Sequence, residues 1–374
     1  MNFKVFKVMD IVGARPQFIK LAPILRAIEQ HNKLCVKEQI CEILLHTGQH
    51  YDYLMSQVFF DELGIKAPDY HLGVGSGTHG YQTGEMLKRI EEVLLNEKPD
   101  LVIVYGDTNS TLAGALASAK LRIPVAHVEA GLRCFNKRVP EEINRILTDH
   151  VSDLLFCPTE TAVKNLKLEG ITEGVHFVGD VMYDAVLMYL EVAEDKSDVL
   201  SRFGLEPKGY ALATIHRAEN TDNLERLSAI LEGLERIAEE GMKVVFPIHP
   251  RTKKQITAIG WQMKGVRVFE PVSYLDMLVL EKNAHLILTD SGGVQKEAFF
   301  FRVPCITLRE QTEWIETVET GWNTLVGCDP DRIVEAATRA KPGRDSAFPY
   351  GDGKAGLKIV EIVCAFLRSA KEQQ

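Results

Sequence analysis

Acidic side chains follow two apolar segments in the N-terminal half of the chain. Asp107 comes after the run LVIVYG, and Glu129 comes after VAHV. Glu141 and Arg145 follow at i, i+4 spacing, so they share one face of a predicted helix. Carboxylates near a reacting centre exchange protons with a substrate and stabilise a developing positive charge. These residue types therefore indicate acid–base chemistry, with a solvated charge ladder as the alternative for the helix face.

Glu129 has an alternative interpretation of its own. A glutamate at the end of a strand buried on both faces can be purely structural if a cation pairs with it. His127 and Arg133 are the candidate partners in the adjacent sequence.

Polar residues in the C-terminal half indicate anion binding. The segment TDSGGVQKEA places Ser291, Gly292 and Gly293 where a helix is expected to begin. Backbone N–H groups at a helix N-terminus bind phosphate, and glycines let a diphosphate approach them. Glu297, further along this helix, can then accept hydrogen bonds from ribose hydroxyls. An ordinary N-cap formed by Asp290 or Ser291 is the alternative.

Apolar runs that alternate with helical patterns would position these residues. Predicted strands cover residues 5–13, 39–48, 100–107, 125–129, 153–159, 210–216, 243–250, 266–271, 285–293 and 305–310. Predicted helices include residues 18–30, 81–96, 112–121, 141–151 and 181–194. Such a series predicts parallel sheets that bind ligands at the carboxyl ends of their strands. The charged residues named above fall at these ends.

The expected fold class is α/β, with two Rossmann-like, doubly wound parallel-sheet domains that face each other across a cleft. The 374 residues are about twice the length of a typical domain. A polar stretch at 195–209 interrupts the strand and helix pattern. We expect an N-terminal domain over residues 1–195, a C-terminal domain over 196–353, and a C-terminal helix in 354–374 that packs back on the N-terminal domain.

Composition and charge exclude several classes of protein. The chain is 45% hydrophobic and 25% charged, and its apolar runs are too short for a membrane span. A net charge of −9 disfavours nucleic acid and anionic membrane surfaces, so local cations must hold any anionic ligand. Seven scattered cysteines without a C-x-x-C pair predict neither a disulfide framework nor a zinc site. The first residues lack the pattern of a signal peptide, and we expect a cytoplasmic protein.

Motifs for metals and dinucleotides are weak. His50, His216 and His249 stand singly on separate predicted loops, without H-x-H or H-E-x-x-H spacing. The segment GSGTHG at 75–80 matches G-x-G-x-x-G, but a Pro-containing loop precedes it instead of a clear strand. We expect no metal and no other cofactor.

The motifs, taken in order, resemble the non-hydrolysing UDP-N-acetylglucosamine 2-epimerases, a family with glycosyltransferase-B architecture. The resemblance covers nearly the whole chain and rests on GARPQFIKLAP, HTGQHYD, YGDTNSTLAG, HVEAGLR, PEEINR, CPTE, HRAEN, HPRT, TDSGGVQKEA and PYGDGKA. It implies substrate-binding roles for Arg15, His249, Ser291, Gly292, Gly293, Glu297 and Arg309. It implies catalytic roles for Lys20, Asp107, Glu129, Glu141, Arg145 and His216. A UDP-sugar substrate and a homodimer are the expected partners.

The implied reaction inverts carbon C2 of a hexosamine. The C2 proton is not next to a carbonyl, so direct abstraction is too costly without an electron-sink cofactor. The family instead eliminates UDP to form a glycal, then adds UDP back after protonation of C2 from the other face. Cations and a helix N-terminus stabilise the departing diphosphate. The expected reaction interconverts UDP-N-acetylglucosamine and UDP-N-acetylmannosamine for surface polysaccharide synthesis.

Three features depart from the family pattern. Trp314 stands where members commonly have the arginine of E-R-P-E, and Lys296 stands where many have glutamate. Both resemble the branch that epimerises UDP-2,3-diacetamido-2,3-dideoxy-glucuronate, whose extra carboxylate Lys296 could bind. A solvated helix lysine is the alternative. Gln49 and His50 lie in the loop beside which many bacterial members bind a second, activating nucleotide sugar, but the helper arginine is missing here.

Functions of other classes stay open. A glycosyltransferase of the same architecture needs an acceptor site, and it has no obvious need for three acids. A hydrolysing epimerase would release free N-acetylmannosamine and UDP. A non-catalytic sensor of nucleotide sugars could dispense with the acids. The joint presence of Asp107, Glu129 and Glu141 favours the epimerase.

Overall fold

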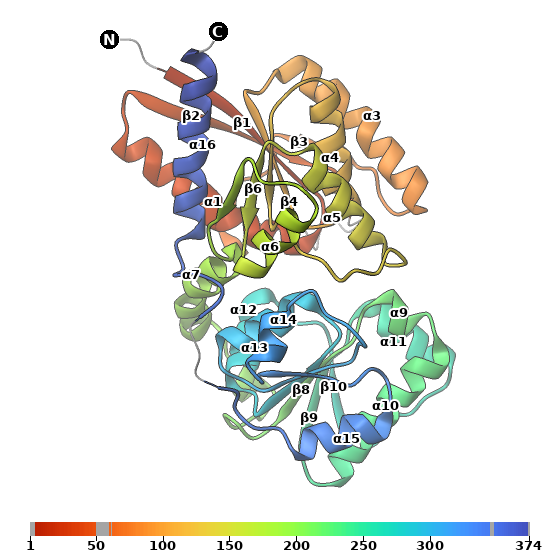
Figure 1. Ribbon diagram of the computed structural model, residues 1–374. Helices are drawn as coiled ribbons and strands as arrows, with labels where there is room; N and C mark the ends of the chain where they lie inside the picture. Colours follow the sequence, from red (N-terminus) through yellow and green to blue (C-terminus); the bar gives the residue numbers. More distant parts are fainter. Residues whose placement is uncertain (1–3, 50–59, 61, 345–347, 373–374) are drawn as a thin grey trace. The chain divides into compact units, whose positions relative to one another are not determined.

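The computed structural model describes residues 4–49, 60, 62–344 and 348–372 (Figure 1). It divides into two compact units. The first comprises Met1–Leu187 and Phe348–Gln374, and the second comprises Met188–Ala347. Each unit contains one sheet whose strands all pair in parallel. The predicted α/β class with two doubly wound parallel sheets is confirmed.

The first unit is built on a sheet with the strand order β3-β2-β1-β4-β5-β6-β7. These strands are β1 (Lys4–Val12), β2 (Glu38–His46), β3 (Tyr70–His71), β4 (Leu101–Tyr105), β5 (Val125–Val128), β6 (Leu154–Cys157) and β7 (Val175–Phe177). Its helices are α1 (Arg15–Leu34), α3 (His79–Glu97), α4 (Asn109–Lys120), α5 (Pro140–Val151), α6 (Glu160–Leu168) and α16 (Ala355–Glu372). Strands β4, β5 and β6 are buried along their whole length, as expected for parallel strands covered on both faces.

The second unit has the strand order β10-β9-β8-β11-β12-β13. These strands are β8 (Ala211–Thr214), β9 (Val244–Pro247), β10 (Val266–Phe269), β11 (Leu286–Thr289), β12 (Cys305–Thr307) and β13 (Asn323–Leu325). Its helices are α8 (Val199–Arg202), α9 (Ala218–Thr221), α10 (Leu224–Glu239), α11 (Pro250–Ala258), α12 (Tyr274–Asn283), α13 (Gly292–Phe300), α14 (Ile315–Glu319) and α15 (Pro330–Thr338). Helix α7 (Val181–Lys196) carries the chain from the first unit into the second.

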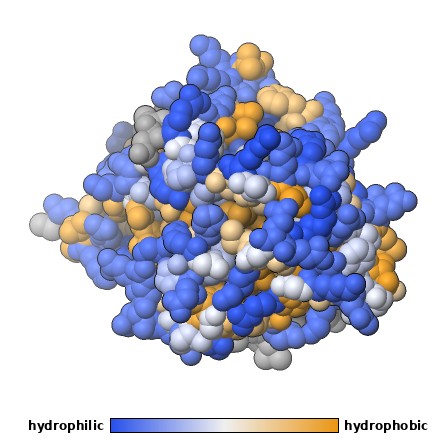
Figure 2. All heavy atoms as spheres, turned by 90° about the horizontal axis from the view of Figure 1, so that it is seen from below, coloured by the Kyte–Doolittle hydropathy of each residue, from blue (hydrophilic) through white to orange (hydrophobic). Residues whose placement is uncertain are grey.

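The described surface is that of a strongly charged chain. The face drawn in Figure 2 is mostly hydrophilic, and its hydrophobic atoms form separate patches. Among the described helices, we find none whose length and hydropathy would let it cross a bilayer.

A pair of acids lies in the core of the first sheet. Asp10 on β1 and Glu42 on β2 are diagonal neighbours on one face, because Asp10 pairs with Leu44 in the register of the two strands. The Tyr105 hydroxyl donates to Asp10 Oδ1, and Lys66 Nζ lies 2.7 Å from Glu42 Oε2. Burial, and next the charge of Glu42, hold the pKa of Asp10 well above its usual range. Folding therefore requires this pair to take up a proton.

This proton makes stability depend on pH. A raised pKa in the folded state means that the contribution of Asp10 to stability is full below its unfolded pKa of about 3.9 and is lost as the pH rises through the folded pKa. Asp10→Asn keeps an acceptor for Tyr105 and offers Glu42 a permanent N–H donor. As the pH rises, the free energy of unfolding of Asp10→Asn should therefore increase relative to that of the wild type by up to about 1.4 kcal/mol per pH unit.

Urea denaturation of both proteins between pH 5 and pH 9 measures this difference. Asp331→Asn, at an exposed side chain, is the control and should run parallel to the wild type. A wild type and Asp10→Asn variant with parallel pH profiles would contradict the assignment of the proton.

Candidate active site

Two of the predicted acids leave the first sheet from neighbouring strands. Tyr105 at the end of β4 pairs with Val128 at the end of β5, so Asp107 and Glu129 emerge at the same edge. Glu129 has a φ of 73°, which is uncommon for a residue other than glycine. Such a backbone conformation costs about 1–3 kcal/mol and is typical of functional positions.

Lys20 on α1 forms an ion pair with Glu129 across the end of the sheet. Both residues are buried, with exposed fractions of 9% and 5%. Gly106, at a φ of 63°, lies against this pair. A Cβ atom at Gly106 would lie 3.0 Å from Lys20 Nζ and 3.3 Å from Glu129 Oε2. Glycine is thus required here both for its backbone conformation and for the space that the ion pair occupies.

Asp107 has a cation of its own. Arg145 Nη1 on α5 donates to Asp107 Oδ2 at 2.6 Å, and Asn144 Nδ2 donates to the Asp107 carbonyl at 2.9 Å. Arg145 also donates twice to Glu142 Oε2, at 2.7 and 2.9 Å. The two acids at the strand ends are therefore each matched by a separate cation.

Glu142 is a buried member of this cluster that sequence reasoning missed. It also accepts hydrogen bonds from the N–H groups of Cys134 and Phe135. Burial alone would raise the pKa of Glu142, but these N–H groups and the Arg145 guanidinium hold it below its usual value. Acids in the first turn of a helix are usually explained by the helix dipole, which hid this role. Glu141, the predicted acid, is half-buried on the same helix.

His127 and Arg133 do not pair with Glu129 through any described bond, and both instead contact Asp149. His127 Nδ1 lies 2.6 Å from Asp149 Oδ1, and Arg133 Nη1 donates to Asp149 Oδ2 at 2.7 Å. His127 Nε2 faces the Gly106 carbonyl at 2.7 Å. The ring thus links Asp149 to the turn that carries Asp107. Arg145 and Asp149 are buried, so this face of α5 is no solvated charge ladder.

Other predicted residues of the first unit lie at helix starts. Arg15 is the first residue of α1, where burial lowers the pKa of its guanidinium. Gln49 Oε1 accepts from Ser110 N at 3.0 Å and from Ser110 Oγ at 2.7 Å, at the beginning of α4. His50 lies outside the described residues.

In the second unit, Asp290 connects the ends of neighbouring strands. It follows β11 and is fully buried. Its carboxylate accepts from the backbone N–H groups of His216 and Arg217 at 3.0 and 3.1 Å. Asn220 Nδ2 donates to it at 3.1 Å. His216 Nδ1 lies 3.4 Å from Asp290 Oδ1, and the His216 ring centroid lies 5.8 Å from that of His249. Asp290 therefore fixes the loop that carries His216.

Helix α13 begins at the glycines of the predicted anion site. Ser291 Oγ accepts from Val294 N at 3.5 Å, a long bond for an N-cap. A Cβ atom at Gly292 would lie 2.9 Å from Glu313 Oε1 and 3.1 Å from Trp314 Nε1. A Cβ atom at Gly293 would meet Ser291 Oγ at 3.8 Å, which is ordinary contact. The two glycines thus differ in how closely the protein packs against them.

Lys296 and Glu297 are both buried on α13. Lys296 is 1% exposed, and its Nζ lies 4.0 Å from the centroid of the Trp314 ring. The solvated-lysine alternative is therefore wrong. Arg309 Nη1 donates to Glu313 Oε2 at 3.2 Å, beside the same tryptophan.

Glu281 on α12 is a further buried acid that sequence reasoning missed. Burial, and next the charge of Glu297, raise the pKa of Glu281 well above its usual value. The protonated form of Glu281 is therefore favoured beside Glu297.

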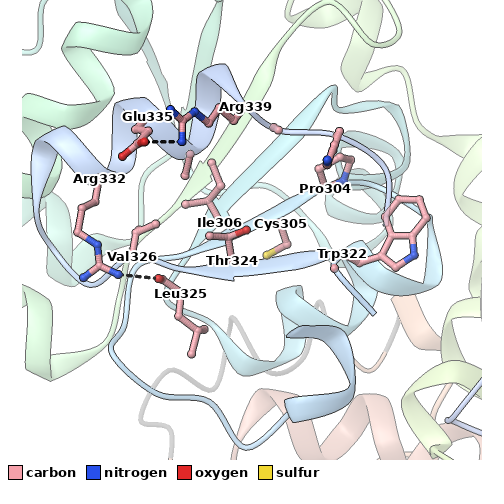
Figure 3. A pocket seen from close by; sticks show the side chains of 14 residues that line it. Pro304, Cys305, Ile306, Trp322, Thr324, Leu325, Val326, Arg332, Glu335 and Arg339 are labelled. Carbon is pink, nitrogen blue, oxygen red and sulfur yellow. Dashed lines mark hydrogen bonds and ion pairs between the residues drawn. The ribbon is translucent and has the colours of Figure 1, made fainter. Parts of the chain in front are cut away.

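A cavity of about 350 Å³ lies elsewhere in the second unit (Figure 3). It is lined by residues of β12, β13 and α15, among them Trp322, Arg332 and Arg339. None of its lining residues belongs to the predicted site, so its volume says nothing about the chemistry at the strand ends.

Comparison with known proteins gives consistent matches over the chain. The family model described as UDP-N-acetylglucosamine 2-epimerase matches residues 32–364. A Methanococcus maripaludis UDP-N-acetylglucosamine 2-epimerase homolog is 53% identical over 364 residues, which cover 96% of this chain and 99% of the relative. The Pseudomonas aeruginosa UDP-2,3-diacetamido-2,3-dideoxy-D-glucuronate 2-epimerase is 51% identical over 362 residues, with the same coverage.

A solved structure agrees with these relatives. The crystal structure of Methanocaldococcus jannaschii UDP-GlcNAc 2-epimerase in complex with UDP-GlcNAc and UDP matches with a TM-score of 0.86 and 48% identity, over 96% of this chain and 99% of that chain. Two parallel-sheet units with charged strand ends, together with these matches, define an epimerase, which is an isomerase. The chain belongs to the UDP-N-acetylglucosamine 2-epimerase family.

The packing at α13 predicts opposite effects for its two glycines. Gly292→Ala should lower the free energy of unfolding by about 1–3 kcal/mol, because the new Cβ displaces Glu313 and Trp314. Gly293→Ala should raise it by up to about 1 kcal/mol, because alanine favours the helix and meets open space. Chemical denaturation measures both values.

The stable Gly293→Ala variant then tests ligand approach. Because its Cβ disturbs no neighbour in the protein, weaker UDP binding in calorimetry would place the diphosphate against this residue. Equal stability losses in the two variants would contradict the packing described for α13.

Proposed function

We propose that this protein is a non-hydrolysing epimerase that interconverts UDP-N-acetylglucosamine and UDP-N-acetylmannosamine. The observation that carries the proposal is the pairing of two strand-end acids with separate cations, Glu129 with Lys20 and Asp107 with Arg145. An opposite charge nearby favours the ionised form of a carboxylate. Two carboxylates held in this way suit a reaction with a cationic, oxocarbenium-like state. No cofactor or metal takes part in the proposed chemistry.

The proposed steps balance without an external reagent. The C1–O bond to UDP breaks, a carboxylate takes the C2 proton, and the remaining electron pair forms the C1–C2 double bond of a glycal. An acid then returns a proton to the other face of C2, and the diphosphate oxygen bonds to C1 again. Asp107, Glu129 and Glu141 are the proposed proton carriers, and Lys20 and Arg145 the cations that hold them.

The second unit is the proposed binding site for the UDP leaving group. We assign the diphosphate to the N-terminus of α13 with His216, His249 and Arg309 in support, and the ribose to Glu297. Arg15 of the first unit is a further UDP-binding residue that the family resemblance implies. Glu297 is a buried carboxylate whose oxygens can accept from two ribose hydroxyls. Helix N–H groups and cations stabilise the negative charge that develops as UDP departs.

We also propose that the protein is a homodimer and works in the cytoplasm. Ile143 and Leu147 on α5 are 44% and 46% exposed at i, i+4 spacing, and Tyr81 on α3 is 57% exposed. Exposed apolar side chains grouped on helices support a homodimer. The proposed location is the cytoplasm, where UDP-sugars are made. The proposed role is the supply of a precursor for surface polysaccharide synthesis.

The reaction itself is tested by NMR in D₂O. Purified protein with UDP-N-acetylglucosamine should form UDP-N-acetylmannosamine that carries one deuterium at C2. Free N-acetylmannosamine with UDP would identify a hydrolysing enzyme. Binding without exchange would identify a sensor, and transfer to an added acceptor would identify a glycosyltransferase.

Glu129 separates a catalytic role from a structural one. Glu129→Gln should lower kcat by about 10²–10⁴-fold, the usual contribution of a positioned acid or base. It should also cost about 1–3 kcal/mol of stability, because it leaves the Lys20 charge buried without its partner. The double variant Lys20→Met/Glu129→Gln removes both charges and should recover much of this stability but no turnover.

Unfolding curves and the deuterium exchange rate are measured on all three proteins. Recovery of turnover along with stability in the double variant would show that Glu129 only supports the core.

A second substrate is favoured by one observation, the buried Lys296 over Trp314. A buried ammonium beside the ribose-binding Glu297 suits a substrate with an additional carboxylate, such as UDP-2,3-diacetamido-2,3-dideoxy-glucuronate. The relative from Pseudomonas aeruginosa is named for that substrate.

Lys296→Met tests this choice while it keeps the apolar stem against Trp314. A charged hydrogen bond contributes about 1.5–3 kcal/mol, so kcat/KM for the uronate should fall by roughly 10–100-fold. Turnover of UDP-N-acetylglucosamine should change little, and Lys254→Met, at an exposed lysine, should change neither. Equal losses on both substrates would assign Lys296 to packing.

A further inference from the structure

A group of potential metal ligands lies in the first unit, apart from the proposed catalytic residues. His31 is near the end of α1, Glu38 is the first residue of β2, and Cys364 is on α16. His31 Nε2 lies 3.6 Å from Cys364 Sγ and 3.9 Å from Glu38 Oε1. Three separate elements thus bring a thiol, an imidazole and a carboxylate together.

The packing of α16 against α1 produces this meeting (Figure 1). A Cβ atom at Gly356 would lie 2.9 Å from the Pro23 carbonyl oxygen, so the two backbones are in close contact there. Cys364 comes eight residues after Gly356, and His31 comes eight residues after Pro23. Eight helical residues span about 12 Å. The two helices therefore run in the same direction. Gly356 lies beside Pro23, and Cys364 lies beside His31 eight residues further along both helices.

The chain between His31 and Glu38 is held rigidly. The Cys35 N–H donates to the His31 carbonyl at 2.8 Å, and the Glu38 N–H donates to the Cys35 carbonyl at 3.1 Å. Asn32 exchanges two hydrogen bonds of 2.8 Å with the backbone of Ile40. Ligands fixed by their own backbone bind a metal without first having to be ordered.

The spacing and the ligand types fit Zn²⁺. Bonds of about 2.3 Å to sulfur and 2.0–2.1 Å to nitrogen or oxygen put the ligand atoms of a tetrahedral ion about 3.3–3.6 Å apart. The observed 3.6 and 3.9 Å differ from this by a few tenths of an ångström. Thiolate and imidazole favour zinc over magnesium or calcium.

We propose that His31, Glu38 and Cys364 form a zinc site that joins the C-terminal helix α16 to α1 and β2. Binding breaks the S–H bond of Cys364, forms a bond between sulfur and zinc, and releases one proton. Burial raises the pKa of this thiol to about 12, so the metal must displace the proton. The half-exposed Arg368, 3.6 Å from Glu38 Oε1, can turn to solvent as the ion takes its place. Thiolate and carboxylate together then balance the two charges of Zn²⁺.

Cobalt substitution tests the proposal on the full-length chain after treatment with a chelator. Co²⁺ should give the thiolate-to-metal charge-transfer absorption of a tetrahedral site. Zn²⁺ should displace the Co²⁺ ion, abolish this absorption and raise the Tm of the protein. Cys364→Ser should abolish the absorption. His31→Gln should weaken Zn²⁺ binding by more than about 100-fold, since even the loss of an outer-shell partner costs 10–100-fold. Cys41→Ser, at an exposed cysteine of β2 outside the group, should leave both unchanged.

Two cobalt results would each overturn the proposal. One is a wild type without a thiolate–cobalt absorption, and the other is an absorption that persists in Cys364→Ser. If Cys364→Ser does not fold, His31→Gln decides the question, because it retains the thiol, and an unchanged Zn²⁺ affinity in that variant overturns the site.

Discussion

The ion pair between Lys20 and Glu129 meets a requirement that applies to both units. A charge placed at the end of a buried parallel strand has to be neutralised inside the protein. Water cannot solvate a carboxylate at 5% exposure, and an unpaired buried charge costs several kcal/mol. The chain meets this cost with Lys20 from α1, with a Glu129 backbone of positive φ, and with a glycine at 106 that leaves room for both. A buried lysine and a positive φ each cost free energy when they occur alone. Together with the glycine they place an ion-paired acid at the sheet edge.

The second unit meets the same constraint with backbone and amide groups. Asp290 is fully buried, and its described donors are two backbone N–H groups and the amide of Asn220, with the ring of His216 nearby. An acid bound in this way fixes a loop without an ion pair to a lysine or an arginine among its described contacts. The two units thus satisfy a buried strand-end acid in different ways, one with an ammonium group and the other with backbone and amide N–H groups.

The sequence predicted the long elements well, because their signals are local. The helix expected at 141–151 is α5 (Pro140–Val151), and the buried run at 100–107 contains β4. The short strands β3, β7 and β13 were missed, since two or three residues carry no periodic pattern and pair only because a neighbouring strand is already in place. Segment 75–80 runs from the loop after β3 into the first two residues of α3, and β3 is only two residues long.

The partners of the charged residues could not be read from the sequence, because pairing depends on tertiary distance. Lys20 and Glu129 are 109 residues apart, and Arg145 and Asp107 are 38 apart. The local candidates for Glu129, His127 and Arg133, are taken by Asp149, which the helix α5 brings beneath the same turn. That arrangement has a chemical consequence. Because His127 Nε2 contacts the Gly106 carbonyl and the Lys20–Glu129 ion pair lies close to Gly106, separate contacts fix the turn between β4 and Asp107. An acid on such a turn can exchange a proton with a substrate without moving its backbone, and this rigidity is what a reaction needs when the same carbon must lose a proton on one face and regain it on the other.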